Sequence, residues 1–250
     1  MTLELGAPQL VVGLLAAFVF GAAKTGVPSI GAFGVALLVT VLPAVPSTGV
    51  ALPILILGDV IAIALYRQHA MVKVLFRLLP SVLIGLALGF VLLRTAEAVT
   101  LTRLIGAILV ISAAGELYRR RPGAAINIHI RAHSPVSTLL GVGAGASTMI
   151  ANAGGPMMTL YLLRMRVTAL SFMGTVAWFF FAVNLLKLPF SVNLGLITRQ
   201  SLLFDLVLVP GLLVGAFVGF RFVQRSSRRV FEMVAILATL AAGLWLLISP

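Results

Sequence analysis

A lysine in a strongly apolar part of the chain is the residue best placed to do chemistry. Lys24 lies in Ala22–Gly34 (AAKTGVPSIGAFG), between the apolar runs Leu5–Gly21 and Val35–Leu42. Glycine and proline interrupt helices, and a cation inside a membrane is costly. Broken backbone at membrane depth is tolerated only where it is buried in protein or lines a wet cavity. The stretch therefore predicts a polar site within a membrane, in preference to a lysine that merely reaches the membrane surface.

The second half of the chain has a matching break, Ile150–Pro156 (IANAGGP), again between apolar segments. A helix that starts after a break offers free N–H groups and the positive end of its dipole, which together suit an anion. Ser29 and Gly31 open one such half-helix, and Gly154 and Gly155 open the other. Two breaks, one in each half, indicate the substrate site of a transporter. We therefore predict a pocket for a small anion near the middle of the membrane.

The predicted substrate contacts come from both breaks and from one later apolar segment. They are Lys24, Thr25, Gly26, Ser29, Gly31, Asn152, Gly154, Gly155, Thr175, Trp178 and Asn184. Asn152 is included because its amide can both donate and accept hydrogen bonds. Trp178 lies deeper in its segment than an interfacial tryptophan would, so a place in the pocket wall and a place in the core are both open.

Asp59 is a carboxylate inside the apolar segment Thr48–Tyr66. An unpaired carboxylate at that depth would be protonated or paired with a cation. Asp59 is therefore the candidate carrier of a coupling proton, and the alternative is a simple ion pair with Lys24. Its counterpart in the second half, Asn184, cannot titrate. The acids near the ends of segments are expected to meet loop arginines; they are Glu116, Asp205 and Glu232.

The composition excludes a soluble protein. Of the 250 residues, 61% are hydrophobic and only 10% are charged, against about 25% charged in a soluble domain. The net charge of +12 comes from short loops between apolar segments, which is typical of membrane orientation signals and not of nucleic-acid binding. There is no cysteine, and the three histidines form no metal-binding pattern. We expect no metal and no cofactor, and the lack of a catalytic motif argues against an enzyme.

The two halves of the chain repeat one another. Pro80, Gly85 and Gly89 recur 130 residues later as Pro210, Gly215 and Gly219, and Gly49 and Asp59 recur 125 residues later as Gly174 and Asn184. We predict an all-α polytopic membrane protein with two inverted repeats, each a broken-helix hairpin followed by three transmembrane helices. The predicted parts are a first repeat at residues 1–120, a cytoplasmic basic loop at 121–134, and a second repeat at 135–250.

Loop charge sets the predicted orientation. If each break is a hairpin that enters and leaves on one side, the repeats are inverted and most loop arginines and lysines share one side. The other side keeps only Arg94, Arg103, Arg199 and Lys187, with Lys187 in a loop at Lys187–Gln200. If each break is instead one interrupted span, the repeats are parallel and the basic residues divide almost evenly. The positive-inside rule favours the inverted arrangement in a bacterial inner membrane, with both termini outside and the long loop inside.

Four stretches of the chain resemble the sulfite exporter TauE/SafE family. They are AKTGVPSIG at Ala23–Gly31, LILGD at Leu55–Asp59, ANAGGPMMTLYLL at Ala151–Leu163 and GTVAWFFFAVNLLKLPF at Gly174–Phe190. The resemblance covers both halves, and the second-half stretches are the more specific. It implies export of sulfite, organosulfonates or related sulfur anions from the cytoplasm.

The leading interpretation is a secondary transporter that exports a small anion by alternating access. An anion channel is one alternative, but a duplicated inverted unit favours alternating access over a pore. A permease for small carboxylates is another. Two costly polar breaks argue against a purely structural membrane subunit. The expected partners are the anion and the lipid bilayer, without nucleic acid, and a homodimer is allowed.

Overall fold

The computed structural model describes residues 6–119, 135–163, 168–225 and 229–248, and this part of the chain is helical without a strand. The predicted cytoplasmic loop at 121–134 lies outside the described residues. The α-helices are α1 (Ala7–Thr25), α2 (Gly31–Leu38), α3 (Ala44–Tyr66), α4 (Val72–Thr95), α5 (Ala98–Arg119), α6 (Pro135–Ala151), α7 (Gly155–Leu163), α8 (Ala169–Asn193), α9 (Arg199–Arg225) and α10 (Arg229–Ile248). Two short 3₁₀ turns, Pro28–Ile30 and Arg67–His69, follow α1 and α3.

Six helices in the described part of the chain are long and apolar enough to cross a membrane. They are α1, α3, α4, α5, α8 and α9. Large apolar side chains cover their outer faces; Phe76 and Phe217, for example, are 70% and 60% exposed. Such a surface suits lipid and not water. The prediction of an all-helical polytopic membrane protein is confirmed.

Both breaks fold the chain back on itself. The eight residues of α2 and the nine of α7 are too short to span a bilayer. α2 packs against α1, with Gly34 against the ring of Phe20, and α7 packs against α6, with Met157 beside Gly143. Each break therefore forms a hairpin, and not one interrupted span.

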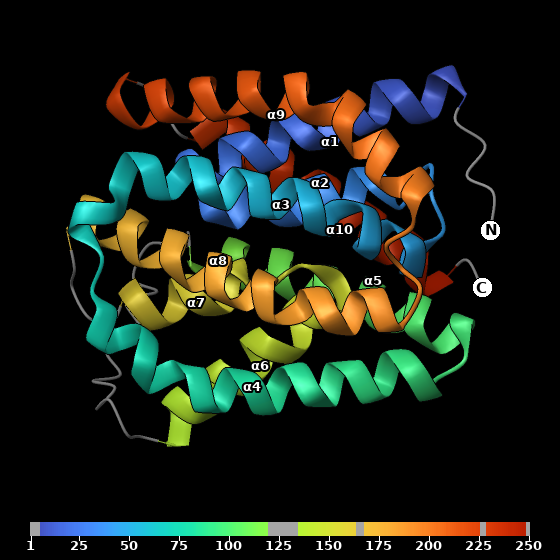
Figure 1. Ribbon diagram of the computed structural model, residues 1–250, viewed down its shortest axis with the longest axis horizontal. Coiled ribbons are helices and arrows are strands. Elements are labelled where there is room, and N and C mark those ends of the chain that lie inside the picture. Colours follow the sequence, from blue (N-terminus) through green and yellow to red (C-terminus); the bar gives the residue numbers. More distant parts are fainter. Residues whose placement is uncertain (1–5, 120–134, 164–167, 226–228, 249–250) are drawn as a thin grey trace.

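The two outer pairs of helices, α1 with α9 and α4 with α6, pack in the same way (Figure 1). Gly21 of α1 lies against the backbone of α9 at Leu212, and Gly145 of α6 lies against the backbone of α4 at Val82. Leu212 follows Val82 by 130 residues, the same offset that separates Pro80, Gly85 and Gly89 from Pro210, Gly215 and Gly219. A side chain at either glycine would collide with backbone atoms, so close helix packing explains these small residues.

The central helices α3 and α8 run antiparallel. Gly49, near the start of α3, packs against Leu196, which follows the end of α8. Gly174, near the start of α8, packs against the turn at His69 and Ala70, which follows the end of α3. Figure 1 shows α3 and α8 between the two outer pairs.

The prediction of a loop at Lys187–Gln200 is wrong at its start. Helix α8 continues through Lys187 and Pro189 to Asn193. The sequence interpretation ended the helix at the first charge, but polar partners surround the Lys187 side chain and allow the helix to continue. Pro189 removes one i→i−4 hydrogen bond, and α8 continues past it for one more turn to Asn193. Without Lys187, the minor side of the predicted orientation keeps Arg94, Arg103 and Arg199, so the charge asymmetry increases.

Candidate functional site

The first break is tied to its surroundings by hydrogen bonds at the end of α1. The Tyr66 hydroxyl donates to the carbonyl of Thr25 at 2.7 Å, and the Thr25 hydroxyl donates to the carbonyl of Ala216 on α9 at 2.7 Å. Carbonyls in the last turn of a helix lack partners within the helix. These bonds fix the direction in which the chain leaves α1 and turns into Pro28.

The second break depends on one asparagine in a left-handed conformation. Asn152 follows α6 with a φ of 49°, which a residue other than glycine rarely adopts but asparagine tolerates. The N–H of Asn152 donates to the carbonyl of Thr148, and the N–H of Ala153 donates to the carbonyl of Ser147. The first of these bonds, from the left-handed residue to the carbonyl four residues earlier, is that of an αL cap. The backbone turn leaves the Asn152 amide free to bond across the site.

The two breaks meet around one small cavity. A side chain at Gly155 would lie 2.9 Å from the carbonyl oxygen of Pro28, so the two half-helices begin close together. The cavity has a volume of about 40 Å³, enough for a few water molecules by the volume that a water needs. Its lining comprises Ala23, Lys24, Pro28, Gly31, Ala32, Leu55, Asp59, Thr148, Asn152, Ala153, Gly155, Val176, Ala177, Phe180 and Asn184.

Lys24, Asp59 and Asn184 form a polar chain across the cavity. The Lys24 ammonium lies 2.5 Å from Asp59 Oδ1, and the Asn184 amide donates to Asp59 Oδ2 at 2.7 Å. The Lys24 ammonium also lies 4.8 Å from the centre of the Phe180 ring, within reach of a cation–π interaction. The pairing alternative for Asp59 is thus present in the structure. Asp59 and Asn184, the repeat counterparts predicted from the sequence, touch each other where α3 and α8 cross.

Lys187 extends this chain and is the functional candidate that the sequence analysis missed. Its side chain is only 1% exposed. Its ammonium donates to Asn152 Oδ1 at 2.5 Å, Thr148 Oγ1 at 3.4 Å and Asn184 Oδ1 at 3.5 Å. Three acceptors match the three N–H donors of an ammonium, and all three residues line the cavity. The available signal was its spacing, because Lys187 is three residues after Asn184 and so lies on the same helix face.

Lys187 also fixes the orientation of the side-chain amides of Asn152 and Asn184. Because each amide oxygen accepts from Lys187, each amide nitrogen must find another partner. The nitrogen of Asn184 donates to Asp59, and the nitrogen of Asn152 donates to the carbonyl of Thr48 at 2.9 Å. The network therefore links both breaks with α3 and α8.

The charges in the site do not balance. Lys24 and Lys187 contribute two ammonium groups, and Asp59 contributes one carboxylate. Among the described residues the Lys24–Asp59 pair is the only ion pair, and Lys187 is bonded to neutral oxygens alone. An uncompensated buried cation is costly. The first residues of α2 and α7 add the positive ends of two helix dipoles, so the site as a whole favours an anion.

The structure brings Lys24, Gly31, Asp59, Asn152, Gly155 and Asn184 into the cavity lining. Thr25, Gly26, Gly154, Thr175 and Trp178 have other neighbours. Gly26 packs against Gly219, and Gly154 packs against Thr148 and Phe180. Thr175 accepts a hydrogen bond from the Met71 N–H at 2.9 Å and joins α8 to the start of α4. Trp178 is 37% exposed and packs edge-on against Phe181. The Thr25 hydroxyl is bonded to α9, and the Ser29 side chain lies outside the described residues.

A family model described as Sulfite exporter TauE/SafE matches residues 10–246. The chain belongs to the sulfite exporter TauE/SafE family. No curated protein and no solved structure matches it. TauE/SafE proteins are membrane exporters, in agreement with the six apolar helices. In this TauE/SafE protein, no group of three histidine or acidic side chains within the described residues is placed to hold a metal.

Proposed function

We propose that the chain is a secondary transporter that exports a small anion, sulfite or an organosulfonate, by alternating access. The observation that carries the proposal is the composition of the cavity network, in which the partly buried ammonium of Lys24 and the buried ammonium of Lys187 stand against the single carboxylate of Asp59. An anion that leaves water needs positive charge or hydrogen-bond donors inside the protein to compensate for its lost hydration. Lys24, the protonated form of Lys187 behind the cavity wall, and the helix starts at Gly31 and Gly155 can supply the compensating positive charge.

Lys24 and Asp59 together suggest how a proton could be coupled to the anion. In this conformation the Lys24 ammonium is engaged by the Asp59 carboxylate at 2.5 Å. Protonation of Asp59 would remove its charge and release Lys24 to bind the anion. Binding of the anion and protonation of Asp59 would then favour each other, as linked equilibria require. Asp59 thus remains the candidate proton carrier of the transport cycle.

The arrangement of helices supports the inverted-repeat part of the proposal. Hairpins at both breaks and antiparallel α3 and α8 are what two inverted halves, residues 1–120 and 135–250, would produce. Alternating access would then be a movement of one repeat against the other around the site between them. The proposed setting is a bacterial inner membrane with both termini outside. A homodimer is to be tested by mass measurement in detergent.

The proposal can be tested by a thermal-shift screen of purified protein with sulfite, sulfoacetate, taurine, thiosulfate and small carboxylates. A ligand that binds the folded state raises the unfolding temperature by mass action. We expect stabilisation by sulfite or a sulfonate, and stabilisation by carboxylates alone would indicate a carboxylate permease. No stabilisation by any anion would contradict an anion site.

Transport is separated from channel activity by flux in proteoliposomes. An alternating-access transporter saturates and shows counterflow, in which unlabelled anion on one side drives labelled anion uphill. A channel shows neither, because it has no step that exchanges one bound anion for another. Counterflow of labelled sulfite is the expected result.

A further inference from the structure

Asp205 is a buried carboxylate that the anion site does not use. It lies in the second turn of α9 and is only 5% exposed. Neither carboxyl oxygen has a hydrogen-bond partner among the described residues. The sequence-based expectation that Asp205 meets a loop arginine is therefore wrong for this part of the chain. Its neighbours Phe204 and Leu208 are also buried, at 3% and 2% exposed, whereas Leu206 is 66% exposed, so the carboxyl group lies on the packed side of a helix whose outer side is exposed.

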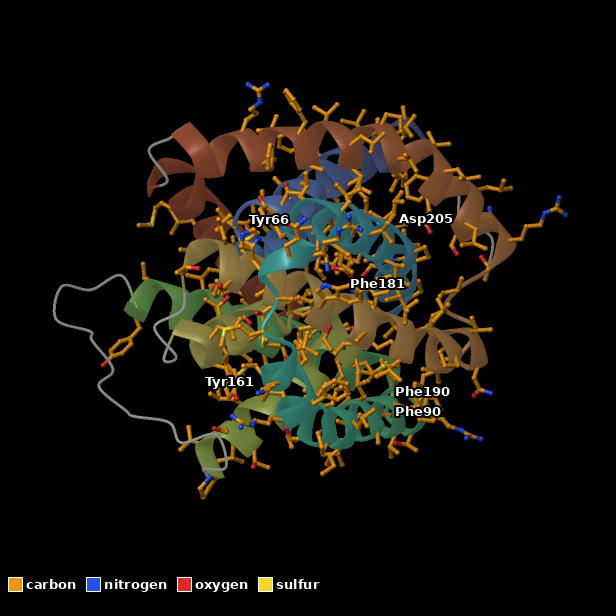
Figure 2. The ribbon with its side chains drawn as sticks, turned by 60° about the vertical axis from the view of Figure 1, so that its left-hand side comes forward. Tyr66, Phe90, Tyr161, Phe181, Phe190 and Asp205 are labelled. Atoms are coloured by element: carbon orange, nitrogen blue, oxygen red, sulfur yellow. The ribbon has the colours of Figure 1, made fainter. Side chains whose placement is uncertain are left out.

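Asp205 is separated from the anion cavity along α9. Leu212 reaches the level of the cavity, since a side chain on Gly58 would meet both Leu212 and Lys24. Asp205 lies seven residues earlier in the helix, which is about 10 Å along the axis. Phe220 lies toward the opposite end of α9, where the centre of its ring is 6.3 Å from the centre of the Tyr66 ring. Figure 2 shows Asp205 and Tyr66 well apart.

The charged groups that face α9 are engaged elsewhere. α1 and α3 are the helices that pack extensively against α9. Lys24 of α1 and Asp59 of α3 pair with each other, and Tyr66 of α3 donates to the carbonyl of Thr25. On α9 itself, Arg199 is exposed and Arg221 lies over the ring of Phe217. An ionised carboxylate at Asp205 would therefore be buried without a donor or a cation among the described residues, which strongly favours its neutral, protonated form.

Asp205 lies on a helix whose packing partners come from the other half of the chain, so its surroundings would change if the two halves moved. α9 belongs to the second half of the chain, whereas α1 and α3 belong to the first. The Asp205 carboxyl group thus lies at the contact between the halves. Movement of one half against the other would expose this carboxyl group to water or to a new partner, and an ionisable group inside a membrane helix usually serves a function.

We propose that Asp205 is a second proton-binding site, protonated in the conformation described here and ionised when α9 moves against α1 and α3. The proton leaves to the solution on the side where α9 begins, and the carboxylate that remains is then hydrated. The proposal rests on the transport function above for its second step only. Protonation of Asp205 in the resting protein can be tested without transport.

Infrared difference spectroscopy tests the first step. A protonated carboxylic acid gives a C=O stretch that a carboxylate lacks, and the band shifts in heavy water. Purified protein at neutral pH should show this band, Asp205→Asn should lose it, and Asp205→Glu should move it if Asp205→Asn does not fold. The control Glu97→Gln, at an exposed acid between α4 and α5, should keep it. A wild-type spectrum without the band, or one unchanged by both Asp205 variants, would overturn the proposal.

Proton movement in proteoliposomes tests the second step. Methanesulfonate is a suitable probe because its own charge does not change near neutral pH, and a trapped pH dye reports protons. Asp205→Asn should bind methanesulfonate within about twofold of the wild type but show a smaller pH change for the same methanesulfonate flux, because only the proton carried by Asp59 remains. A full pH change in that variant would refute the release step. If the wild type moves no anion at all, the transport function fails, and the infrared band still decides whether Asp205 is protonated.

Discussion

The Lys24 ammonium and the Asp59 carboxylate lie 2.5 Å apart and join the first helix break to the middle of α3. In this ion pair, Asp59 neutralises the positive charge of Lys24 that an incoming anion would need. Because Asn184 holds the second oxygen of Asp59, the pair is also connected to α8 and the second half of the chain. Binding of an anion, release of Asp59 and movement of the two halves can therefore depend on one another.

Replacement of Asp59 by asparagine should remove the pH dependence of anion binding. In the wild type, affinity for methanesulfonate should rise as pH falls, by at most about tenfold per pH unit for one coupled proton. Asp59→Asn leaves Lys24 free at every pH, so its affinity should be uniform and sulfonate exchange should survive. Calorimetric titrations with methanesulfonate at several pH values between 5 and 8 would measure the affinity of both proteins. The slope of affinity against pH gives the number of protons taken up with the anion. A pH dependence identical to that of the wild type would exclude Asp59 as the proton carrier.

Replacement of Lys187 by methionine should weaken anion binding more than it weakens the fold. The variant loses three hydrogen bonds but also removes a buried cation that has no ion-pair partner. These effects oppose each other in the empty protein, so the stability change should stay below the ~3–5 kcal/mol of a broken buried pair. Anion affinity should fall about tenfold, because the through-space attraction between the Lys187 ammonium and the bound anion is lost. Unchanged affinity with a large loss of stability would make Lys187 purely structural.

Two glycines on the same helix should respond differently to alanine. A Cβ at Gly145 would collide with the backbone of Val82 and Leu86 on α4, whereas a Cβ at Gly143 would only meet the flexible end of Met157 at 3.5 Å. Gly145→Ala should therefore destabilise the protein by at least ~1–3 kcal/mol, as overpacking does. Gly143→Ala serves as the control and should be neutral or slightly stabilising, because alanine favours helix. Equal unfolding temperatures for the two variants would contradict the close approach of α4 and α6.

Labelling of single cysteines should establish the orientation, because the chain has no cysteine of its own. A cysteine at Glu97, between α4 and α5, and one at the C-terminus should react with an impermeant reagent from outside. Cysteines at Ala124 and Ser226, which lie outside the described residues, should react only from inside. If Glu97 and Ala124 label from the same side, the repeats are not inverted.

The helical fold and the broken-helix hairpins could be predicted because their signals are local. The sequence itself shows apolar runs long enough to span a membrane, glycine and proline residues that interrupt helices near Pro28 and Gly155, and glycines that recur at a constant offset. Lys187 could not be placed in the same way. A charge beside a proline resembles a loop, and only the folded chain shows that oxygens from Thr148, Asn152 and Asn184 surround it.

Asp205 was misjudged for a related reason. Near a helix end, a carboxylate usually reaches water or an arginine, and its burial depends on how α9 packs against α1 and α3. The predicted contacts Thr25, Thr175 and Trp178 belong to segments next to the cavity, but their helix faces turn them toward other partners. Side-chain direction at these positions follows from helix pairing, which a single sequence does not specify.

The most direct test of the anion site is calorimetric titration of the wild type, Lys24→Ala and the double variant Lys24→Ala/Asp59→Asn with sulfite. Lys24→Ala alone leaves Asp59 buried without its cation, so the double variant separates the loss of the anion contact from that defect. We predict that both variants bind sulfite about 10- to 150-fold more weakly than the wild type, corresponding to ~1.5–3 kcal/mol for a charge-assisted contact. Near-normal affinity in the double variant would show that Lys24 only pairs with Asp59, and would contradict an anion site built on Lys24.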